Sequence, residues 1–517
     1  MRLEQTLRIS AARNPGKTAL VAGDVRLSYA DLDALSDRLA GALLRRGIER
    51  GDRVVVFTDN RWEAVVAIYA IQKAGAVFSP INPSTKADKL GYVLSNCRAR
   101  AIVTQTNRLT VVADAAKAAP SLELTISAGD GRETETPGLC RFEDLIVEPG
   151  PAPRPEEAGI ELDLSMLVYT SGSTGNPKGV MMTHQNVLAA STSIVTYLEN
   201  TADDIILGVL PISFDYGLYQ VLMSVQVGAT LVLEKSFAFP YAILKRLAEE
   251  KVTGFPLVPT MAAMILQMKD VGPEAFAGLR YITNTAAALP ASHIARLREL
   301  MPGTIVYSMY GLTECKRCTW LPPEQLDIRP GSVGIAIPGT EAFVVGDDGL
   351  PVAPGVTGEL VIRGPHVMRG YWENPEATDK ALKPGPYPWE KVLYTGDLFR
   401  ADEDGFLYFV ARKDDIIKTR GEKVSPKEVE AVLYAMPGIR EAAVIGVPDP
   451  ILGAAIRAVV VAADGAAFTE RDVIRHCARN LEDFMVPKTV EIRDALPKTD
   501  SGKINRRLVE QQALEVA

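Results

Sequence analysis

Segments with the periodicity of buried strands alternate with segments of helical periodicity along most of this chain, and no other feature restricts its fold as strongly. Residues 31–46 carry leucine and alanine at intervals of three and four, as an amphipathic helix does. Residues 52–59 form a short run of branched side chains typical of a buried strand, and residues 62–76 are again helical. The strand pattern returns at 76–83 and at 98–104. Strands separated by helices pair in parallel through crossover connections, so we predict an α/β fold.

The sequence changes character toward its C-terminal end, which indicates more than one domain. A chain of 517 residues exceeds what one hydrophobic core organises. From about residue 330 to 410, short apolar runs are broken by glycine, proline and Asp-Gly, as in the hairpins of a small β-subdomain. Helical patterns return after about residue 425. We predict an N-terminal domain of parallel-rich sheets, flanking helices and this β-subdomain at 1–411, and a small α+β domain at 412–517.

Charge and composition exclude several classes of partner. The net charge is −8 and no long basic stretch occurs, which argues against nucleic acid because phosphate backbones require clustered lysine and arginine. No run of about 18 apolar residues is present, so we expect no membrane span. The N-terminal segment lacks the apolar core of a signal peptide, and five scattered cysteines are too few for a disulfide framework. We therefore expect a cytoplasmic protein.

Two of the cysteines form a Cys-x-x-Cys pair, Cys315 and Cys318. This spacing occurs in redox-active and metal-binding sites. No second such pair is present and no histidine lies close by in the sequence, since the whole chain has four. We interpret the pair as structural, with a metal or redox role as the alternative.

The segment Tyr169–Gly179 has the composition of a phosphate-binding loop. It reads Tyr-Thr-Ser-Gly-Ser-Thr-Gly-Asn-Pro-Lys-Gly, between a strand-like run and a helix that begins near His184. Backbone N–H groups and hydroxyls in such a loop are free to surround a polyphosphate, and Lys178 adds a compact positive charge. A solvated Ser/Gly linker is seldom flanked by a strand and a helix start. The P-loop of nucleotide hydrolases requires G-x-x-x-x-G-K-[ST], which fails here because glycine follows Lys178.

Five motifs in a fixed order resemble the signatures of adenylate-forming enzymes, the superfamily of acyl-CoA synthetases, peptide-synthetase adenylation domains and luciferases. The phosphate loop resembles the first signature, and the resemblance runs from about residue 10 to about residue 510. One motif can arise by chance, whereas five in order do not. The chain is therefore identified as a stand-alone AMP-dependent synthetase and ligase. The other motifs are Tyr310-Gly-Leu-Thr-Glu314, Tyr394-Thr-Gly-Asp397, Arg412-Lys-Asp-Asp-Ile-Ile-Lys418 with Gly421, and Pro497-Lys-Thr-Asp-Ser-Gly-Lys503.

The resemblance implies a reaction in two steps. A carboxylate attacks the α-phosphorus of ATP and releases pyrophosphate, and a thiol then attacks the acyl-adenylate. The adenylation transition state carries dense negative charge, so positioning and electrostatics dominate its catalysis. Thr313 would donate to the α-phosphate, and Glu314 would bind Mg²⁺ through a carboxylate oxygen. Lys503 would bridge the carboxylate and α-phosphate oxygens.

The same resemblance assigns the nucleotide site. Tyr310 would stack against the adenine, and Asp397 would accept hydrogen bonds from both ribose hydroxyls, with Arg412 nearby. Taken alone, Asp397 would also suit a turn-capping role after Thr-Gly. The residues assigned to ATP or AMP are Thr170, Ser171, Gly172, Ser173, Thr174, Gly175, Lys178, Tyr310, Gly311, Asp397 and Arg412.

Similar enzymes rotate their C-terminal domain between the two steps, and Asp414 matches the hinge position of that family. This residue lies at the domain boundary that the sequence pattern indicates, where a hinge absorbs a large change of backbone angles. Gly421 and Lys423 would then face the tunnel for the pantetheine thiol. Ala411 stands where the family usually has glycine, and because alanine is also small we expect activity to be kept.

The acid pocket is predicted from the segment Pro211–Tyr216 and from the residues after the second motif. Aryl- and fatty-acyl-CoA members usually carry histidine in this segment, whereas this chain has Asp215, which in amino-acid-activating members pairs with the substrate ammonium. Arg317 is the alternative, internal partner, because a buried carboxylate requires a cation. Polar and bulky side chains disfavour a long alkyl tunnel. The predicted pocket residues are Asp215, Tyr216, Tyr219, Thr283, Thr285 and Arg317.

These alternatives lead to two kinds of acid and two thiol acceptors. From the sequence we favour an amino acid or small polar acid loaded on the phosphopantetheine of a carrier protein. The alternative is a CoA ligase for an aryl or short acyl acid. Gly421 and Lys423 disfavour a luciferase-like enzyme without a thiol step, and Lys503, Glu314 and Asp414 disfavour an inactive nucleotide-binding regulator. The expected cofactors are ATP and Mg²⁺.

Overall fold

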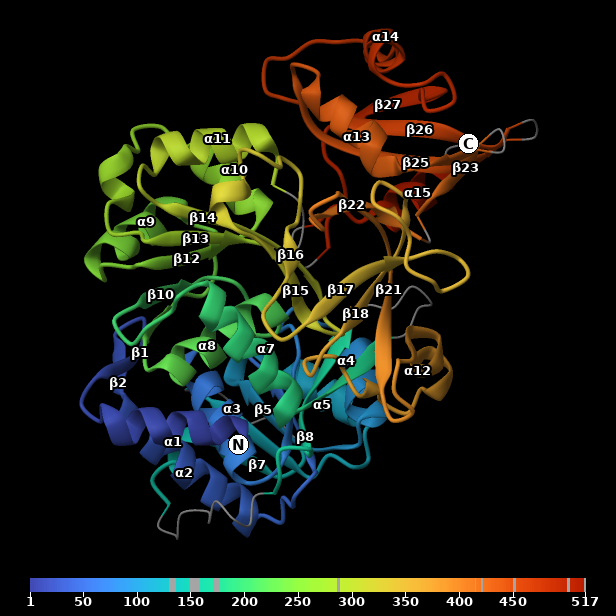
Figure 1. Cartoon of the computed structure of the whole chain (residues 1–517). Helices are drawn as coiled ribbons and strands as arrows, with labels where there is room; N and C mark the ends of the chain where they lie inside the picture. The colour runs from blue at the N-terminus through green and yellow to red at the C-terminus, as the bar shows by residue number, and fades with distance from the viewer. Residues whose placement is uncertain are drawn as a thin grey trace. The chain divides into compact units, whose positions relative to one another are not determined.

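A computed structural model of the chain consists of two compact units. Unit 1 comprises Met1–Ala342 and Ile362–Tyr394, and unit 2 comprises Phe343–Val361 and Thr395–Ala517. Sheets and helices occur in both units (Figure 1). The residues that the structure describes are 1–129, 136–148, 159–170, 177–285, 289–413, 415–419, 422–449, 452–499 and 503–515.

Unit 1 contains a nine-stranded sheet that is parallel through its centre. Antiparallel pairing is confined to its ends, where β2 pairs with β1 and where β14, β15 and β16 follow one another. The spatial order departs from the sequence order because parallel neighbours require long crossover connections. In spatial order the strands are β16 (Ile335–Ala336), β15 (Lys316–Leu321), β14 (Ile305–Leu312), β13 (Tyr281–Asn284), β12 (Gly254–Leu257), β10 (Ile205–Gly208), β11 (Thr230–Leu233), β1 (Thr18–Ala22) and β2 (Val25–Ser28).

The second sheet of unit 1 has eight strands, with antiparallel pairing only at β8, β9 and β19. Strands buried on both faces carry nearly continuous apolar runs, as Val54–Phe57 does in β3. In spatial order the strands are β19 (Gly370–Tyr371), β9 (Lys178–Thr183), β8 (Leu164–Thr170), β4 (Val77–Pro80), β3 (Arg53–Phe57), β5 (Ala99–Gln105), β6 (Leu124–Ala128) and β7 (Leu139–Arg141).

Helices flank these sheets, and α2, α7 and α12 begin at a residue whose side chain caps the helix. Helix α2 begins after Ser28, whose hydroxyl accepts the Asp31 N–H at 3.1 Å, while the Asp31 carboxylate accepts the Ser28 N–H at 2.9 Å. Figure 1 shows α9, α10 and α11 close to β12, β13 and β14. The helices of unit 1 are α1 (Leu3–Arg13), α2 (Tyr29–Arg45), α3 (Trp62–Lys73), α4 (Ala87–Asn96), α5 (Leu109–Ala116), α6 (Phe142–Leu145), α7 (His184–Tyr197), α8 (Asp215–Val227), α9 (Pro240–Glu249), α10 (Pro259–Gln267), α11 (Ala291–Leu300) and α12 (Pro375–Ala381).

The core of the eight-stranded sheet lies between its central strands and helices α4 and α5. Val55, Phe57 and Ile102 from the strands pack in one apolar cluster with Leu94 from α4 and Val112 from α5. Burial of each such side chain contributes about 1.5–3 kcal/mol relative to its exposure. This packing fixes the frame that carries the connection between β8 and β9.

The five-stranded sheet of unit 2 has helices on both faces because its strands are apolar at successive positions. Along β25, Ala442 and Val444 cluster with α13 and α14, whereas Ala443 and Ile445 cluster with α15. Successive side chains of a strand point to opposite faces, so both faces require cover. The elements are β24 (Glu422–Val424), β23 (Ile417–Thr419), β26 (Gly453–Ala462), β25 (Ile439–Asp449), β27 (Thr489–Arg493), α13 (Pro426–Ala435), α14 (Glu470–Asn480) and α15 (Arg506–Glu515).

The glycine-rich part of the sequence forms a further sheet with antiparallel strands. In unit 2, β22 pairs with β21 so that Asp397 lies opposite Arg412. In unit 1, the first residues of β21 pair with β20. The strands are β17 (Glu341–Val345), β18 (Gly358–Arg363), β20 (Leu382–Pro384), β21 (Lys391–Ala401) and β22 (Leu407–Arg412).

The observed sheets and helices confirm the predicted α/β class. The division between the two units falls between Tyr394 and Thr395 and assigns Phe343–Val361 to unit 2. The predicted domain boundary after Ala411 concerns the part of the chain that would rotate, and it stays a prediction. None of the described helices combines the length and the apolar character that crossing a membrane requires.

Candidate active site

The predicted phosphate loop connects two antiparallel neighbours, β8 and β9. Thr170 at the end of β8 pairs with Lys178 at the start of β9, so the two ends of the loop lie side by side. Helix α7 begins at His184 as expected, but β9 lies between the loop and the helix, with Val180 and Met182 buried. The loop residues outside the described part of the chain are Ser171, Gly172, Ser173, Thr174 and Gly175.

Strand β19 and its Tyr371 contact both the start of β9 at the phosphate loop and Glu314 of the second motif. The sequence of β19 itself matches none of the five motifs. The strand pairs with β9, and the Trp372 N–H donates to the Gly179 carbonyl at 2.7 Å. Lys178 Nζ lies 5.3 Å from the centre of the Tyr371 ring, within cation–π range. The Tyr371 hydroxyl donates to Glu314 Oε1 at 2.7 Å. Burial raises the pKa of Tyr371, which keeps its phenol protonated as the donor.

The second motif, Tyr310–Glu314, runs from β14 into the turn before β15. The Cys315 N–H donates to the Leu312 carbonyl at 3.1 Å, which closes the turn. Gly311 is required beside it, since a Cβ there would lie 1.8 Å from the Lys316 carbonyl oxygen. The motif therefore lies at the carboxyl end of a parallel strand, where open α/β sheets bind their ligands.

Asp215 and Arg317 form a buried ion pair in the predicted acid pocket. Asp215 begins α8, where the helix N-terminus favours a carboxylate. Its Oδ2 lies 3.9 Å from Arg317 Nη1. The Arg317 guanidinium lies 4.5 Å from the centre of the Tyr216 ring, and the Tyr216 hydroxyl donates to the Thr283 carbonyl at 2.8 Å. These contacts bring four of the predicted pocket residues together. Arg317 lies beside Asp215, as the alternative to a substrate ammonium requires.

Lys316 belongs to the same group of contacts, although lysine is a residue type that sequence reasoning places on the surface. Its Nζ lies 5.7 Å from the centre of the Tyr219 ring, and its side chain is fully buried. In the described part of the chain, neither Lys316 Nζ nor the Tyr219 hydroxyl has a hydrogen-bond partner. Burial lowers the pKa of Lys316, against the attraction of nearby Asp215. Thr285, directly after β13, is buried as well.

Cys315 and Cys318 are both buried free thiols. Their Sγ atoms lie 3.0 Å apart, at hydrogen-bonding distance for thiols. Burial raises the pKa of Cys315, which keeps the thiol neutral. Within the ranges that the structure describes, no group of three or more histidine, cysteine or acidic residues could hold a metal ion. The structural interpretation of the pair stays a prediction.

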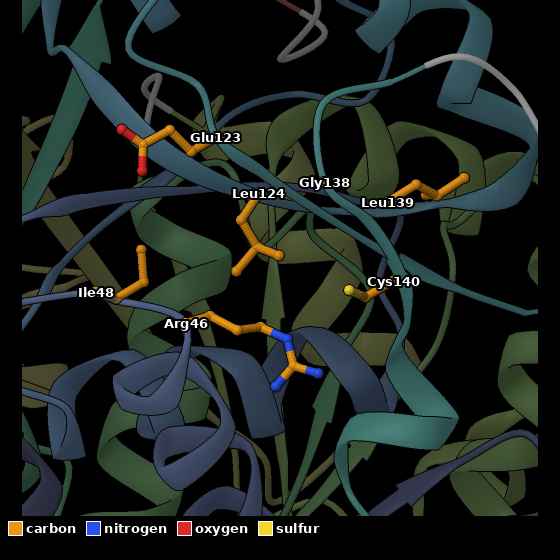
Figure 2. A pocket seen from close by; sticks show the side chains of 7 residues that line it. All are labelled: Arg46, Ile48, Glu123, Leu124, Gly138, Leu139 and Cys140. Atoms are coloured by element: carbon orange, nitrogen blue, oxygen red, sulfur yellow. The ribbon is translucent and has the colours of Figure 1, made fainter.

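A pocket of about 420 Å³ in unit 1 contains none of the predicted site residues (Figure 2). Arg46 lines it, but its guanidinium forms an ion pair with Glu148, so the pocket offers no uncompensated cation there. Cys140, which is partly exposed, also lines the pocket. The lining residues are Arg46, Ile48, Glu123, Leu124, Gly138, Leu139 and Cys140.

In unit 2, Asp397 and Arg412 face each other across β21 and β22. Arg412 Nε lies 3.4 Å from Asp397 Oδ1. The Asp397 N–H donates to Thr395 Oγ1 at 3.2 Å. Asp397 is buried, whereas the Arg412 side chain is 65% exposed. The role of both residues at the ribose stays a prediction.

Lys503, near the C-terminal end of the chain, is hydrogen-bonded to Thr499. Its N–H donates to Thr499 Oγ1 at 3.2 Å, its carbonyl accepts the Thr499 N–H at 2.7 Å, and its side chain is exposed. Lys423 lies in β24, opposite Lys418 of β23. Two further predicted residues, Asp414 and Gly421, lie outside the described residues.

Known proteins are similar to this chain over almost its whole length. Residues 7–372 match the family described as AMP-binding enzyme, and residues 428–503 match the AMP-binding enzyme C-terminal domain. The feruloyl-CoA synthase of Amycolatopsis sp is 34% identical, over 96% of this chain and 95% of that protein. The long-chain-fatty-acid–CoA ligase of Escherichia coli O157:H7 is 33% identical, over 98% of this chain and 93% of that protein.

A solved structure agrees with these relatives. The crystal structure of ATP-bound MatB from Rhodopseudomonas palustris has a TM-score of 0.89 at 30% identity, with 100% of each chain covered. The resemblance drawn from the five motifs is thereby confirmed. The chain belongs to the AMP-binding enzyme family, and it is an AMP-forming ligase of the acyl-CoA synthetase type.

Proposed function

We propose that this enzyme is a CoA ligase that activates a small carboxylic acid without an α-amino group. The acid and ATP would form an acyl-adenylate and pyrophosphate, and the CoA thiol would then displace AMP to form the thioester. The ion pair between Asp215 and Arg317 is the observation that carries this proposal.

The charges around Asp215 disfavour an amino acid as substrate. In an amino-acid pocket this carboxylate would have to be available for the substrate ammonium. Here Arg317 Nη1 already lies 3.9 Å from it, and Lys316 adds a second buried cation close by. An entering ammonium would meet two cations beside Asp215, and like charges repel strongly where little water screens them. An acid without an amine avoids this repulsion.

Two further parts of the proposal are CoA as the thiol and a small size of the acid. The relatives support the first, and the tyrosines of the pocket support the second. The feruloyl-CoA synthase and the long-chain-fatty-acid–CoA ligase are both named for CoA, which supports CoA as the thiol. Their acids differ widely, so they leave the acid open. Tyr216 and Tyr219 are almost fully buried and occupy volume that a long alkyl chain would require, which supports a small acid.

Residues of unit 1 would position ATP for the first step. Thr170 and Lys178 at the two ends of the phosphate loop would contact the β- and γ-phosphates, and Lys178 would add the compact charge. The Tyr371 hydroxyl would orient the Glu314 carboxylate through their hydrogen bond. Lys503 of unit 2 would supply the cation at the α-phosphate, where negative charge develops.

Glu314 suits a Mg²⁺ ion that arrives with the triphosphate. Its Oε1 accepts the Tyr371 hydroxyl, while Oε2 has no hydrogen-bond partner among the described residues. Mg²⁺ is bound by one or two carboxylates and completes its shell with phosphate oxygens and water, so a single free carboxylate oxygen fits this chemistry. The bound ion would neutralise phosphate charge.

The second step would use a different face of the C-terminal domain. We propose that residues 412–517 rotate about Asp414 once the acyl-adenylate has formed, which would bring Gly421 and Lys423 to the pantetheine tunnel. Hinges of this kind absorb the motion in a few boundary residues. Asp397 and Arg412 would hold the ribose of the adenylate meanwhile.

Acid-dependent ATP–pyrophosphate exchange tests the proposal, with a panel of amino acids, aryl acids and short fatty acids. We expect exchange with acids that lack an amine, followed by a CoA thioester that mass spectrometry identifies. A phosphopantetheinylated carrier protein in the same assay serves as the competing acceptor. Exchange confined to amino acids and lost in Asp215→Ala would identify a carrier-protein loader and contradict the proposal.

A further inference from the structure

Lys316 has a backbone conformation that lysine rarely adopts. Its φ is +65°, in the left-handed region, directly after the turn that Cys315 and Leu312 close. Hairpins of this kind usually place glycine or asparagine at the left-handed residue, because a Cβ there is crowded. The turn itself gives no reason for a lysine at this position, and strained residues of this kind gather at functional sites.

The Lys316 ammonium is also buried without a counterion. Its side chain is fully enclosed, and among the described residues Nζ has neither a hydrogen bond nor a carboxylate within 4.0 Å. Lys73 shows how this chain otherwise buries a lysine. Its Nζ is equally enclosed but contacts the carboxylates of Asp33 and Asp37 at 2.5 and 2.9 Å. Burial of a lysine in this chain therefore does not by itself explain why Lys316 Nζ lacks a carboxylate partner.

The charges around Lys316 leave one cation uncompensated. Asp215 is paired with Arg317, and Glu314 is directed to the metal and the phosphates in the proposed function. The ring of Tyr219 lies 5.7 Å from Lys316 Nζ, and its buried hydroxyl also lacks a partner. An ammonium and a hydroxyl are both donors, and a carboxylate can accept from both.

We propose that the acid activated here is a dicarboxylic acid whose second carboxylate binds Lys316 Nζ, with the Tyr219 hydroxyl as a second donor. The proposal rests on the proposed function, because it takes these residues to line the acid pocket. The flexible lysine stem lets Nζ meet the ligand without a change of the turn. A matched monocarboxylic acid would leave the buried ammonium unpaired, and this difference is the source of selectivity.

Acids matched except for the second carboxylate test this inference on the full-length enzyme. The pairs are succinate with butyrate, glutarate with pentanoate, and isophthalate with benzoate, compared by ATP–pyrophosphate exchange. A hydrogen bond to a charged group corresponds to about 10- to 100-fold in affinity. We expect kcat/KM for a dicarboxylate to exceed that of its partner by this factor.

Substitution of Lys316 should remove the preference. In Lys316→Met the KM for the dicarboxylate should rise about 10- to 100-fold, so that its advantage over the matched monocarboxylate is lost. Lys316→Asn is the second variant, because asparagine tolerates a positive φ and a loss of folding cannot imitate the result. Lys117→Met changes a lysine that is 78% exposed and should leave both values unchanged.

The outcomes separate this inference from the proposed function. A wild-type enzyme that prefers the monocarboxylates, or a preference for dicarboxylates that persists in both Lys316 variants, overturns the inference and leaves the CoA ligase assignment in place. Exchange with α-amino acids alone overturns both. A dicarboxylate preference that is lost in Lys316→Met and Lys316→Asn and kept in Lys117→Met supports it.

Discussion

Replacement of Asp215 by asparagine should destabilise unit 1 more than replacement of its partner Arg317 by methionine. Asp215→Asn leaves Arg317 and Lys316 as two buried cations without a carboxylate between them. Arg317→Met leaves Asp215 and Lys316, one carboxylate and one ammonium that attract each other. Breaking a buried ion pair costs about 3–5 kcal/mol when a charge is left alone, so we expect Asp215→Asn near the upper value and Arg317→Met at or below the lower one.

Thermal unfolding measures this difference. An unfolding entropy of about 2.1 cal/mol/K per residue amounts to roughly 0.8 kcal/mol/K for a unit of this size, so a loss of about 4–5 kcal/mol lowers the Tm by about 5–6 °C. Asp327→Asn is the matched control. The Asp327 carboxylate lies closer to its cation, 2.7 Å from Arg298 Nη1, but its side chain is 74% exposed. An exposed pair contributes about 0–1 kcal/mol, so the Tm should fall by about 1 °C or less.

Two results would refute this reasoning. Equal decreases of the Tm in Asp215→Asn and Arg317→Met would mean that Lys316 does not offset the charge of Asp215 once Arg317 is removed. A decrease in Asp327→Asn as large as in Asp215→Asn would mean that distance, and not burial, determines the contribution of an ion pair here. The double variant Asp215→Asn/Arg317→Met should be more stable than Asp215→Asn alone, because it removes one of the two uncompensated cations.

Four further predictions concern the two steps and the site. Lys503→Ala should abolish pyrophosphate exchange yet spare thioester formation from supplied acyl-adenylate, and equal loss of both steps would contradict its role. Asp414→Pro should do the reverse, because proline fixes φ at the hinge; an unchanged overall ligase rate would contradict rotation. Tyr371→Phe should lower the exchange rate about tenfold and raise the Mg²⁺ concentration for half-maximal rate, because Glu314 loses its orienting donor; an unaltered Mg²⁺ dependence would exclude this role. Exchange with a dicarboxylate should weaken as the pH rises through the lowered pKa of Lys316, below the ordinary lysine value of 10.5, since the ammonium is then lost. The same decrease of exchange with pH for a monocarboxylate would contradict a role of the Lys316 ammonium in binding the second carboxylate.

Long periodic elements of this fold are predictable from the sequence, and short ones are not. The helical pattern at 31–46 corresponds to α2 (Tyr29–Arg45), and the apolar run at 52–59 corresponds to β3. Strand β19 has two residues, too few to show any period, and β9 begins inside the loop motif at Lys178. Strand order is equally hidden, because β1 pairs with β11 far along the chain, which only the packing of the whole unit determines.

The candidate site divides in the same way. Residues inside a motif can be assigned from the sequence because the motif fixes their neighbours. Tyr371 lies 57 residues from Glu314 in a segment without a motif, so their hydrogen bond emerges only when β19 pairs with β9. Lys316 is a residue type that is mostly exposed, and no sequence pattern predicts its burial. The pair of Asp215 and Arg317 can be proposed from chemistry, but its formation depends on how α8 packs against β15.

The partial exposure of Cys140 makes this chain convenient for fluorescence labelling. The other four cysteines are buried, and burial raises the pKa of Cys97 and Cys477 to about 11, so these thiols react slowly at neutral pH. A maleimide dye should therefore label the native protein at one position, on β7 in unit 1, without the removal of any cysteine. With an acceptor dye introduced into unit 2 through an unnatural amino acid, a change in energy transfer as ATP, acid and CoA are added in turn would test the proposed rotation about Asp414.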